Sequence, residues 1–355
     1  MSALATTPAT PPAPPLALAS ASGSRKIPIV LPGHTRPIAE VSFPPPTCDG
    51  TFLVSACHDK TPMLRLADSG DWVGSFVGHK GAVWSAKLND SCLLAATAGG
   101  DFTARVWDAI TGAELFKFDH KHIVKSVDFS GDSSRIATGG HEGLLRVYEL
   151  NCPGDDPVVV DVNKDRRGGE GKLKISKVEW DGNSIFVGCD DGSVKVYDMS
   201  AFFNVTSEDN NTENQAEVLL TTLEVRGEVM DMELSRDLNI MTVASGDEVS
   251  FFDTTKGGDY KLLKRHKMPK KVEDRSYDCN FKNEGGASLH PDGKKFIAGG
   301  GSLWVFVFDF ETGKEIEKLK GHHGPVRCVR YNKGDGGNTY ASGSEDGTIR
   351  LWSDL

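Results

Sequence analysis

The chain has 355 residues, and its 40 lysines and arginines against 50 aspartates and glutamates leave a net charge of −10. This acidic balance argues against a generally basic nucleic-acid-binding domain, although a local basic patch is compatible with it. No apolar run reaches the roughly 18 to 20 residues that a membrane-spanning helix needs, and no C-x-x-C pair indicates a zinc ribbon. We therefore expect no membrane insertion.

Residues 1–25 are rich in alanine, proline and serine and are predicted to form a disordered tail, because such a composition buries too little apolar surface to fold. They lack the basic segment of a secretory signal, and residues 1–24 contain no arginine, which argues against a transit peptide. We expect a cytoplasmic protein that also enters the nucleus, with a folded region over residues 26–355.

Similar units repeat along the folded region. GHTRPIAEVSF (33–43), GHKGAVWSAKL (78–88) and GHHGPVRCVRY (321–331) share one pattern, and DHKHIVKSVDF (119–129) has aspartate in place of the glycine. Each unit closes on an aromatic or apolar residue, and the seven closing positions are Leu66, Trp107, Tyr148, Tyr197, Phe252, Phe308 and Trp352. Three of the six intervals, 41, 41 and 44 residues, match the ~40 to 45 residues of a WD-repeat blade, and the other three, 49, 55 and 56 residues, indicate insertions in the middle of the chain.

Within each unit, short runs alternate apolar and polar residues between turn sequences such as HPDG (290–293), which predicts an all-β protein. Seven four-stranded blades around an axis, a seven-bladed WD-repeat β-propeller, fit this spacing. The last unit lacks an outermost strand after Trp352, so we expect Lys26–Leu31 (KIPIVL) to complete the seventh blade and close the ring. Three insertions, 153–172, 201–217 and 267–287, are expected to be exposed loops.

Two units contain a histidine, a hydroxyl, an aspartate and a tryptophan at matching spacings. These structural tetrads are His79, Thr97, Asp101 and Trp107, and His322, Ser342, Asp346 and Trp352. The repetition argues against a catalytic triad, because an active site is needed once whereas a hydrogen-bond network is useful in every blade. We therefore expect no catalytic residues, and no motif for a metal, a cofactor or a small-molecule substrate is present.

Other units carry weaker copies of the tetrad. The third has His120, Thr138, Glu142 and Tyr148, and the fourth keeps Asp191 but has Val187 at the hydroxyl position. The units that close on Phe252 and Phe308 have no recognisable tetrad.

A basic run over 261–271 is interpreted either as a solvated edge strand and loop or as a contact for RNA or an acidic partner. Its cations are Lys261, Lys264, Arg265, Lys267, Lys270 and Lys271.

Several contiguous strings are more specific than generic WD repeats. PMLRLADSGDWVGSFVGHKGAVWSAKL (62–88), AATAGGDFTARVWDAITGAEL (95–115) and YASGSEDGTIRLW (340–352) resemble the serine-threonine kinase receptor-associated protein family, also called the unr-interacting protein family. The resemblance implies a non-catalytic scaffold of the survival-of-motor-neurons complex, which assembles spliceosomal small nuclear ribonucleoproteins. Protein partners and indirect or weak RNA contact follow from it. The alternatives are a translation-initiation or mRNA-binding subunit, or an adaptor that restrains receptor-kinase signalling.

The family resemblance also implies a partner-binding surface on the narrow top rim of the propeller. In a WD propeller this rim is formed by the residues three and five positions after the Gly-His histidine and by the residue before the turn acid. Here these positions are Pro37, Trp84, Lys125, Pro325, Arg327, His58, His141 and Glu345. Trp84 and Arg327 belong to residue types that are favoured as interface anchors. The alternative for Trp84 is packing beneath a neighbouring blade.

Overall fold

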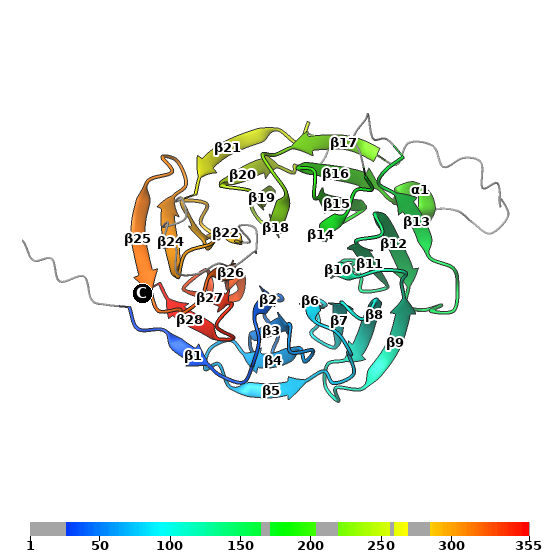
Figure 1. The fold of residues 1–355 in the computed structure, drawn as a ribbon, viewed down its shortest axis with the longest axis horizontal. Helices are drawn as coiled ribbons and strands as arrows, with labels where there is room; N and C mark the ends of the chain where they lie inside the picture. The colour runs from blue at the N-terminus through cyan, green and yellow to red at the C-terminus, as the bar shows by residue number, and fades with distance from the viewer. Residues whose placement is uncertain (1–25, 165–170, 204–218, 256–258, 269–284, 355) are drawn as a thin grey trace, which may run out of the picture.

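The computed structural model describes residues 26–164, 171–203, 219–255, 259–268 and 285–354. Seven four-stranded sheets stand as blades around a common axis, as Figure 1 shows. We call the region between the innermost strands of the blades the central channel. The prediction of an all-β, seven-bladed propeller is confirmed. The tail predicted for residues 1–25 lies outside the described residues.

Blades 1 to 3 each run from the channel outward in chain order. Blade 1 contains β2 (Ile38–Ser42), β3 (Phe52–Cys57), β4 (Met63–Leu66) and β5 (Trp72–Ser75). Blade 2 contains β6 (Val83–Leu88), β7 (Leu94–Gly99), β8 (Thr103–Asp108) and β9 (Glu114–Asp119). Blade 3 contains β10 (Val124–Phe129), β11 (Arg135–Gly140), β12 (Leu144–Glu149) and β13 (Val158–Asp161).

Blades 4 to 6 follow the same order, and blade 7 combines the two ends of the chain. Blade 4 contains β14 (Ile175–Asp181), β15 (Ser184–Cys189), β16 (Ser193–Asp198) and β17 (Leu219–Glu224). Blade 5 contains β18 (Val229–Ser235), β19 (Ile240–Ser245), β20 (Glu248–Asp253) and β21 (Leu262–Lys267). Blade 6 contains β22 (Ala287–Leu289), β23 (Lys295–Ala298), β24 (Trp304–Asp309) and β25 (Glu315–Lys320). Blade 7 contains β26 (Val326–Tyr331), β27 (Thr339–Ser344), β28 (Ile349–Ser353) and β1 (Ile29–Leu31).

The strand β1 closes the ring, as the sequence predicts, although it covers only part of the expected segment 26–31. It pairs antiparallel with β28, with Ile29 opposite Leu351. Leu31 is 3% exposed and packs into a cluster shared with blade 1, whereas Val30 on the opposite face is 45% exposed. Lys26 precedes the strand and forms an ion pair with Asp354 at 3.2 Å. The beginning of the folded region is therefore fixed to its end.

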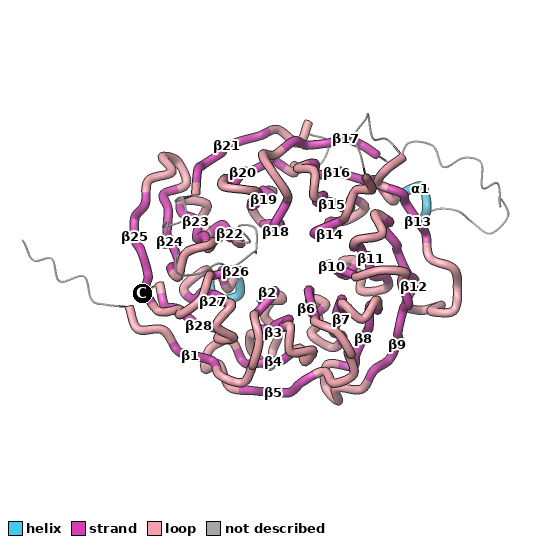
Figure 2. The backbone as a smooth tube through the Cα atoms, viewed as in Figure 1, coloured by secondary structure: helices cyan, strands magenta, loops and turns pink. Residues whose placement is uncertain are grey.

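Strands and loops make up nearly the whole ring, as the tube drawing in Figure 2 shows. In the described part of the chain the helical elements are α1 (Ser200–Phe203) and the 3-10 turn η1 (Lys333–Asp335). Neither of them is long and apolar enough to cross a membrane. The prediction that 153–172 is an exposed loop is wrong in part. This segment contains β13, which pairs with β12 because VVVD offers a β-branched run to an otherwise open blade edge.

The hydrophobic core lies between neighbouring blades. One representative cluster joins Val54 and Leu64 of blade 1 to Val83 and Ala86 of blade 2 and includes the buried Trp107. Middle strands such as β7 bury five of their six residues, because both faces of a blade are covered by its neighbours. Each large side chain buried in this way contributes roughly 1.5 to 3 kcal/mol.

The closing residue of blade 1 differs from the sequence interpretation. Leu66 was expected there, but the register places Arg65 opposite Leu53, which is the position that Trp107 occupies opposite Ala95 in blade 2. Arg65 is 4% exposed, and its guanidinium donates to the carbonyl of Gly70 at 3.1 Å and to that of Pro32. An arginine therefore stands at the aromatic position of this blade.

Candidate binding site at the mouth of the central channel

The tetrad of blade 2 forms one connected hydrogen-bond network. His79 Nδ1 donates to Asp101 at 3.0 Å, and His79 Nε2 accepts from the Thr97 hydroxyl at 2.7 Å. The Trp107 indole N–H donates to the same hydroxyl at 2.9 Å. Asp101 also accepts from the backbone N–H of Lys80 at 2.8 Å. The network therefore ties the loop before the inner strand to the second and third strands of the blade.

Blade 7 repeats this geometry. His322 Nε2 lies 2.7 Å from Ser342 Oγ, His322 Nδ1 lies 3.2 Å from Asp346, and the Trp352 indole donates to Ser342 at 2.8 Å. Burial opposes the ionisation of Asp346, but hydrogen bonds from His322 and the His323 amide outweigh it and hold the pKa of Asp346 well below its usual range. The same repeated pattern of donors marks a structural network, in which the hydroxyl is held between two nitrogen atoms.

Blade 1 contains a third network that the sequence analysis did not identify. His34 donates from Nδ1 to Asp59 at 2.8 Å, and its Nε2 lies 2.8 Å from Ser55 Oγ. The usable signal was the four-residue step from Ser55 to Asp59 after a Gly-His pair. The network was not recognised because Arg65 occupies the position at which an aromatic residue was expected.

A metal-like arrangement accompanies this network. Among the described residues, His34, Cys57 and Asp59 bring three potential ligand atoms within 4.8 Å of one another. His34 Nδ1 is already engaged by Asp59, and Cys57 Sγ lies 3.1 Å from the Arg36 carbonyl. Burial raises the pKa of the Cys57 thiol to about 12, whereas metal binding requires the thiolate. This chemistry fits a blade network better than a metal site.

In blade 3 the residues of the weaker tetrad copy have different hydrogen-bond partners from those expected. Glu142 forms an ion pair with Arg146 and accepts from the Lys121 amide. His120 Nδ1 lies 2.7 Å from Arg146 Nη1, so its ring contacts the arginine and not the Thr138 hydroxyl. The spacing of hydroxyl and acid is therefore retained while the histidine has changed its partner. In blade 4, Asp191 accepts from the hydroxyl of Ser193 at 2.6 Å.

Beside these networks, a β-bulge recurs at the second residue of six inner strands. The register between first and second strand shifts at that residue in β2, β6, β10, β14, β18 and β26. A bulged residue is left out of the ladder, and its side chain is re-aimed. The six bulged residues are Ala39, Trp84, Lys125, Ser176, Met230 and Arg327, and all of them line one pocket at the mouth of the channel. The bulges therefore build this site.

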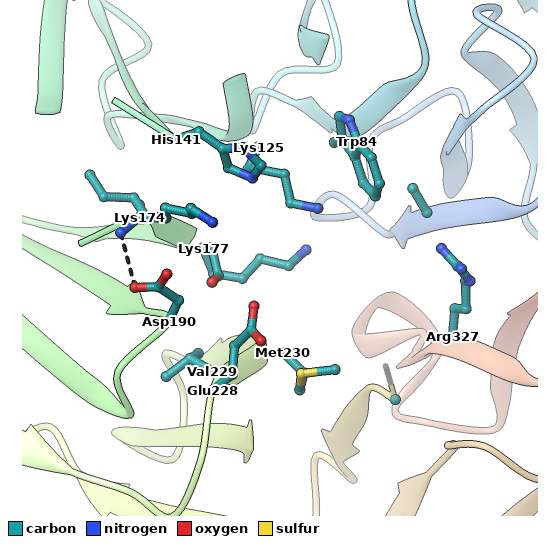
Figure 3. A pocket seen from close by; sticks show the side chains of 14 residues that line it. Trp84, Lys125, His141, Lys174, Lys177, Asp190, Glu228, Val229, Met230 and Arg327 are labelled. Carbon is teal, nitrogen blue, oxygen red and sulfur yellow. Dashed lines mark hydrogen bonds between the residues drawn. The ribbon is translucent and has the colours of Figure 1, made fainter. Parts of the chain in front are cut away.

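The pocket has a volume of about 430 Å³ and is shown in Figure 3. Trp84 is the centre of a contact group on its rim. The ring of His58 meets the indole edge-on at 4.4 Å between centroids, and the Lys125 ammonium lies 3.2 Å from the centroid of the indole ring. Trp84 is half-buried by these contacts on the rim, and it does not belong to the clusters between blades.

Arg327 and Glu345 form another part of the rim. The guanidinium donates through Nε and Nη2 to Glu345 Oε1 at 3.1 and 3.0 Å. Arg327 is 6% exposed, so this arginine is more enclosed than a rim anchor was expected to be. The remaining rim positions fix the backbone, because Pro37 accepts from the amide of His58 and Pro325 accepts from that of Glu345, each at 3.0 Å.

Positive charge is concentrated at this mouth. Burial and the charges of Arg327 and Lys125 lower the pKa of His58 to about 4. Burial and the charges of Lys125 and Lys174 do the same for His141, whose pKa is also about 4. Both imidazoles are therefore neutral at physiological pH.

Below the mouth, buried ion pairs cross the channel. Lys177 of blade 4 meets Glu40 of blade 1 at 2.5 Å, and Lys87 of blade 2 meets Glu179 of blade 4 at 2.9 Å. Burial opposes the ionisation of Glu40, but Lys177 outweighs it and lowers the pKa of Glu40 to about 2. These charges were not identified in the sequence, although an ionisable residue at the third or fifth position of an apolar inner strand was the available signal.

Part of the basic run 261–271 forms an edge strand, as one of its two interpretations predicts. β21 is the outermost strand of blade 5, where Lys264 pairs with Glu311 at 2.7 Å and Arg265 donates to Ser250 Oγ at 3.2 Å. Lys261 and Lys267 are exposed. Lys270 and Lys271 lie outside the described residues, so the geometry of the complete run is not on view.

The repeats of this chain are similar to those of known WD-repeat proteins. The family model described as WD domain, G-beta repeat matches residues 70–108, 112–149, 170–198 and 313–353. The serine-threonine kinase receptor-associated protein of Dictyostelium discoideum is 38% identical over 329 residues, which cover 92% of this chain and 99% of that protein. The protein of the same name from Homo sapiens is 38% identical over 92% of this chain and 83% of its own length. Eukaryotic translation initiation factor 3 subunit I of Schizosaccharomyces pombe is 26% identical over 91% of this chain and 95% of its own length.

Proposed function

Because the chain belongs to the serine-threonine kinase receptor-associated protein family of WD-repeat proteins, we propose that it is a non-catalytic scaffold that supports the assembly of spliceosomal small nuclear ribonucleoproteins. In this role it binds proteins of the survival-of-motor-neurons complex, in the cytoplasm and also in the nucleus. It needs no cofactor or metal, and its contact with RNA is indirect or weak. The propeller supplies a rigid surface and no chemical step.

The observation that carries the scaffold role is the ring of bulged residues around the mouth. Six of the seven inner strands each contribute one bulged residue to the lining of one pocket, and Trp84 and Arg327 are residue types that anchor protein interfaces. The blade frame does not require a tryptophan at the bulge, because Ala39 and Ser176 occupy the corresponding place in blades 1 and 4. At the mouth, therefore, the backbone bulge recurs from blade to blade while the residue type at the bulge differs.

A translation-initiation role is the second candidate. Its support is the relative named translation initiation factor 3 subunit I, together with the lysines on the exposed strand β21. The identity to that relative, 26%, is lower than the 38% to the receptor-associated proteins, which is why the assembly role comes first. An adaptor role at receptor kinases is a third outcome that the same experiment detects.

Affinity purification with mass spectrometry tests the proposal through one substitution at the mouth. Trp84→Ala removes the indole that His58 and Lys125 contact, and Trp72→Ala on β5, whose side chain is 61% exposed, is the matched control. We expect the wild type and Trp72→Ala to retain Sm proteins and subunits of the assembly complex, and Trp84→Ala to lose them at an unchanged melting temperature. Arg327→Glu is unsuitable, because it places a second carboxylate beside Glu345.

The identity of the retained proteins separates the alternatives. Initiation-factor subunits in place of Sm proteins would favour the translation role, and receptor kinases would favour the adaptor role. Equal retention by Trp84→Ala and Trp72→Ala would remove the mouth as the partner surface. A large fall in the melting temperature of Trp84→Ala would instead assign the indole to the folded core.

A further inference from the structure

The charges at the mouth identify the kind of segment that fits it. We propose that the pocket binds an acidic peptide segment of a partner protein, with a carboxylate on the side formed by Trp84, Lys125 and Arg327. This inference rests on the scaffold role proposed above and specifies the chemistry of the partner. It concerns the pocket alone and does not depend on which complex supplies the peptide.

The first argument is the local field. The chain as a whole carries a net charge of −10, yet the pocket is lined by four cations, Lys125, Lys174, Lys177 and Arg327, against two carboxylates, Asp190 and Glu228. His58 and His141 respond to this field, because burial and these cations together lower the pKa of both imidazoles to about 4. An incoming carboxylate therefore enters a region in which added negative charge is favoured.

The second argument is that the cations are already in place. The Lys125 ammonium rests 3.2 Å from the centroid of the Trp84 ring, and Arg327 is held by two hydrogen bonds to Glu345. Side chains that are ordered before binding lose less conformational entropy when the ligand arrives. In Figure 3 the side chains of Lys125 and Arg327 extend from opposite sides of the opening, with Trp84 beside them.

The third argument favours a peptide over a nucleic acid. Asp190 and Glu228 line the same pocket, and their carboxylates repel a run of phosphates. Lys125 covers one face of the Trp84 ring, which reduces the stacking surface that single-stranded nucleic acids use. A peptide with a few separated carboxylates avoids both problems, because its backbone N–H groups suit the Glu228 side of the pocket.

The test uses the full-length protein and three fluorescein-labelled probes of equal length. These are a ten-residue peptide of alternating glycine and glutamate, the same peptide with glutamine, and a ten-nucleotide oligouridylate. Dissociation constants are measured by fluorescence anisotropy for the wild type, Lys125→Gln and Lys117→Gln. Lys117 on β9 is the matched control, because its side chain is 41% exposed on an outer strand and its ammonium pairs with Asp119.

We expect the glutamate peptide to bind the wild type and Lys117→Gln equally, and the glutamine peptide to bind more weakly. Lys125→Gln should weaken binding of the glutamate peptide by roughly tenfold, the usual effect of losing one charge-assisted hydrogen bond. Equal binding of the two peptides, or an unchanged constant for Lys125→Gln, overturns the inference. Oligouridylate binding that depends on Lys125 overturns it in favour of a nucleic-acid site.

Failure of this inference is distinguishable from failure of the proposed function. Capture of Sm proteins that depends on Trp84, together with indifference to the glutamate peptide, would refute only the acidic chemistry. Lys125-dependent binding of the glutamate peptide, together with capture of unrelated complexes, would refute only the assembly role.

Discussion

Arg330 on β26 and Asp231 on β18 form a two-point ion pair across the central channel. Arg330 Nη2 lies 2.7 Å from Asp231 Oδ1, and Nη1 lies 2.5 Å from Oδ2, although the two residues are 99 positions apart in the chain. The pair joins blade 7 to blade 5, which are separated in the ring by blade 6. Both side chains are 5% exposed, so the pair is enclosed by the channel wall. Long-range pairs of this kind connect blades that share no blade-to-blade core.

Glu40 and Lys177 give the sharpest test of these channel pairs. Glu40→Gln removes the nearer carboxylate from the buried Lys177 ammonium and leaves Asp231, 3.5 Å away, which is shared with Arg330, so we expect a loss of unfolding free energy that approaches the roughly 3 to 5 kcal/mol of a broken buried pair. The double variant Glu40→Gln with Lys177→Met removes both charges and should recover most of that loss. Urea unfolding measures the wild type, the single variant, the double variant and the exposed-pair control Lys117→Gln. A loss in Glu40→Gln no greater than that in the exposed-pair variant Lys117→Gln would contradict the prediction.

Substitution of Asp101 tests the interpretation that the tetrads are hydrogen-bond networks that stabilise the fold. Asp101→Ala leaves His79 Nδ1 and the Lys80 amide without their acceptor, and we expect a loss of roughly 1 to 3 kcal/mol. Asp191→Ala is the matched control in blade 4, where the carboxylate contacts Ser193 and no tetrad is present. It should cost less than Asp101→Ala. Thermal unfolding compares the two variants, and an equal cost in both would show that the histidine network adds no stability.

The number of blades could be predicted because closing residues and turns recur at a fixed interval in the chain. The tetrads of blades 2 and 7 were accessible for the same reason. The network in blade 1 was missed because Arg65 replaces the aromatic residue by which the pattern was recognised. β13 was missed because its four residues lie inside a polar insertion, and only the open edge of β12 makes them a strand.

The channel and its mouth were less accessible to sequence reasoning. Nothing local to Glu40 indicates that its partner is Lys177, because the pairing depends on the two inner strands facing each other across the ring. Trp84 and Lys125 were expected on the rim only because the family resemblance assigns their repeat positions to it. The bulges that aim them into one pocket are set by the register between two strands, which the alternation of residues does not reveal.

Leu31 tests closure of the ring by β1. Leu31→Ala removes a side chain that packs with Leu351 and Ile38, and we expect a loss of about 2 to 5 kcal/mol. Val30→Ala in the same strand is the matched control, because Val30 is 45% exposed and should cost well under 1 kcal/mol. Urea unfolding again gives the comparison. Equal stability of the two variants would show that β1 lies against blade 7 without closing the ring.

The last prediction concerns stability against pH, through His58, His120 and His141. Burial together with neighbouring cations lowers the pKa of each imidazole from its usual 6.5 to about 4. Between pH 6.5 and 4 the unfolded chain therefore binds protons that the folded chain excludes, so the free energy of unfolding falls as the pH falls. Above pH 6.5 the same groups are neutral in both states and contribute no slope. We expect the melting temperature to decline from pH 7 to pH 5, and His58→Gln with His141→Gln to make that decline shallower. Substitution of the exposed His323 by glutamine is the control for loss of an imidazole. A double variant whose decline matches that of the wild type would show that these two rings gain their protons at the same pH in the folded and unfolded states.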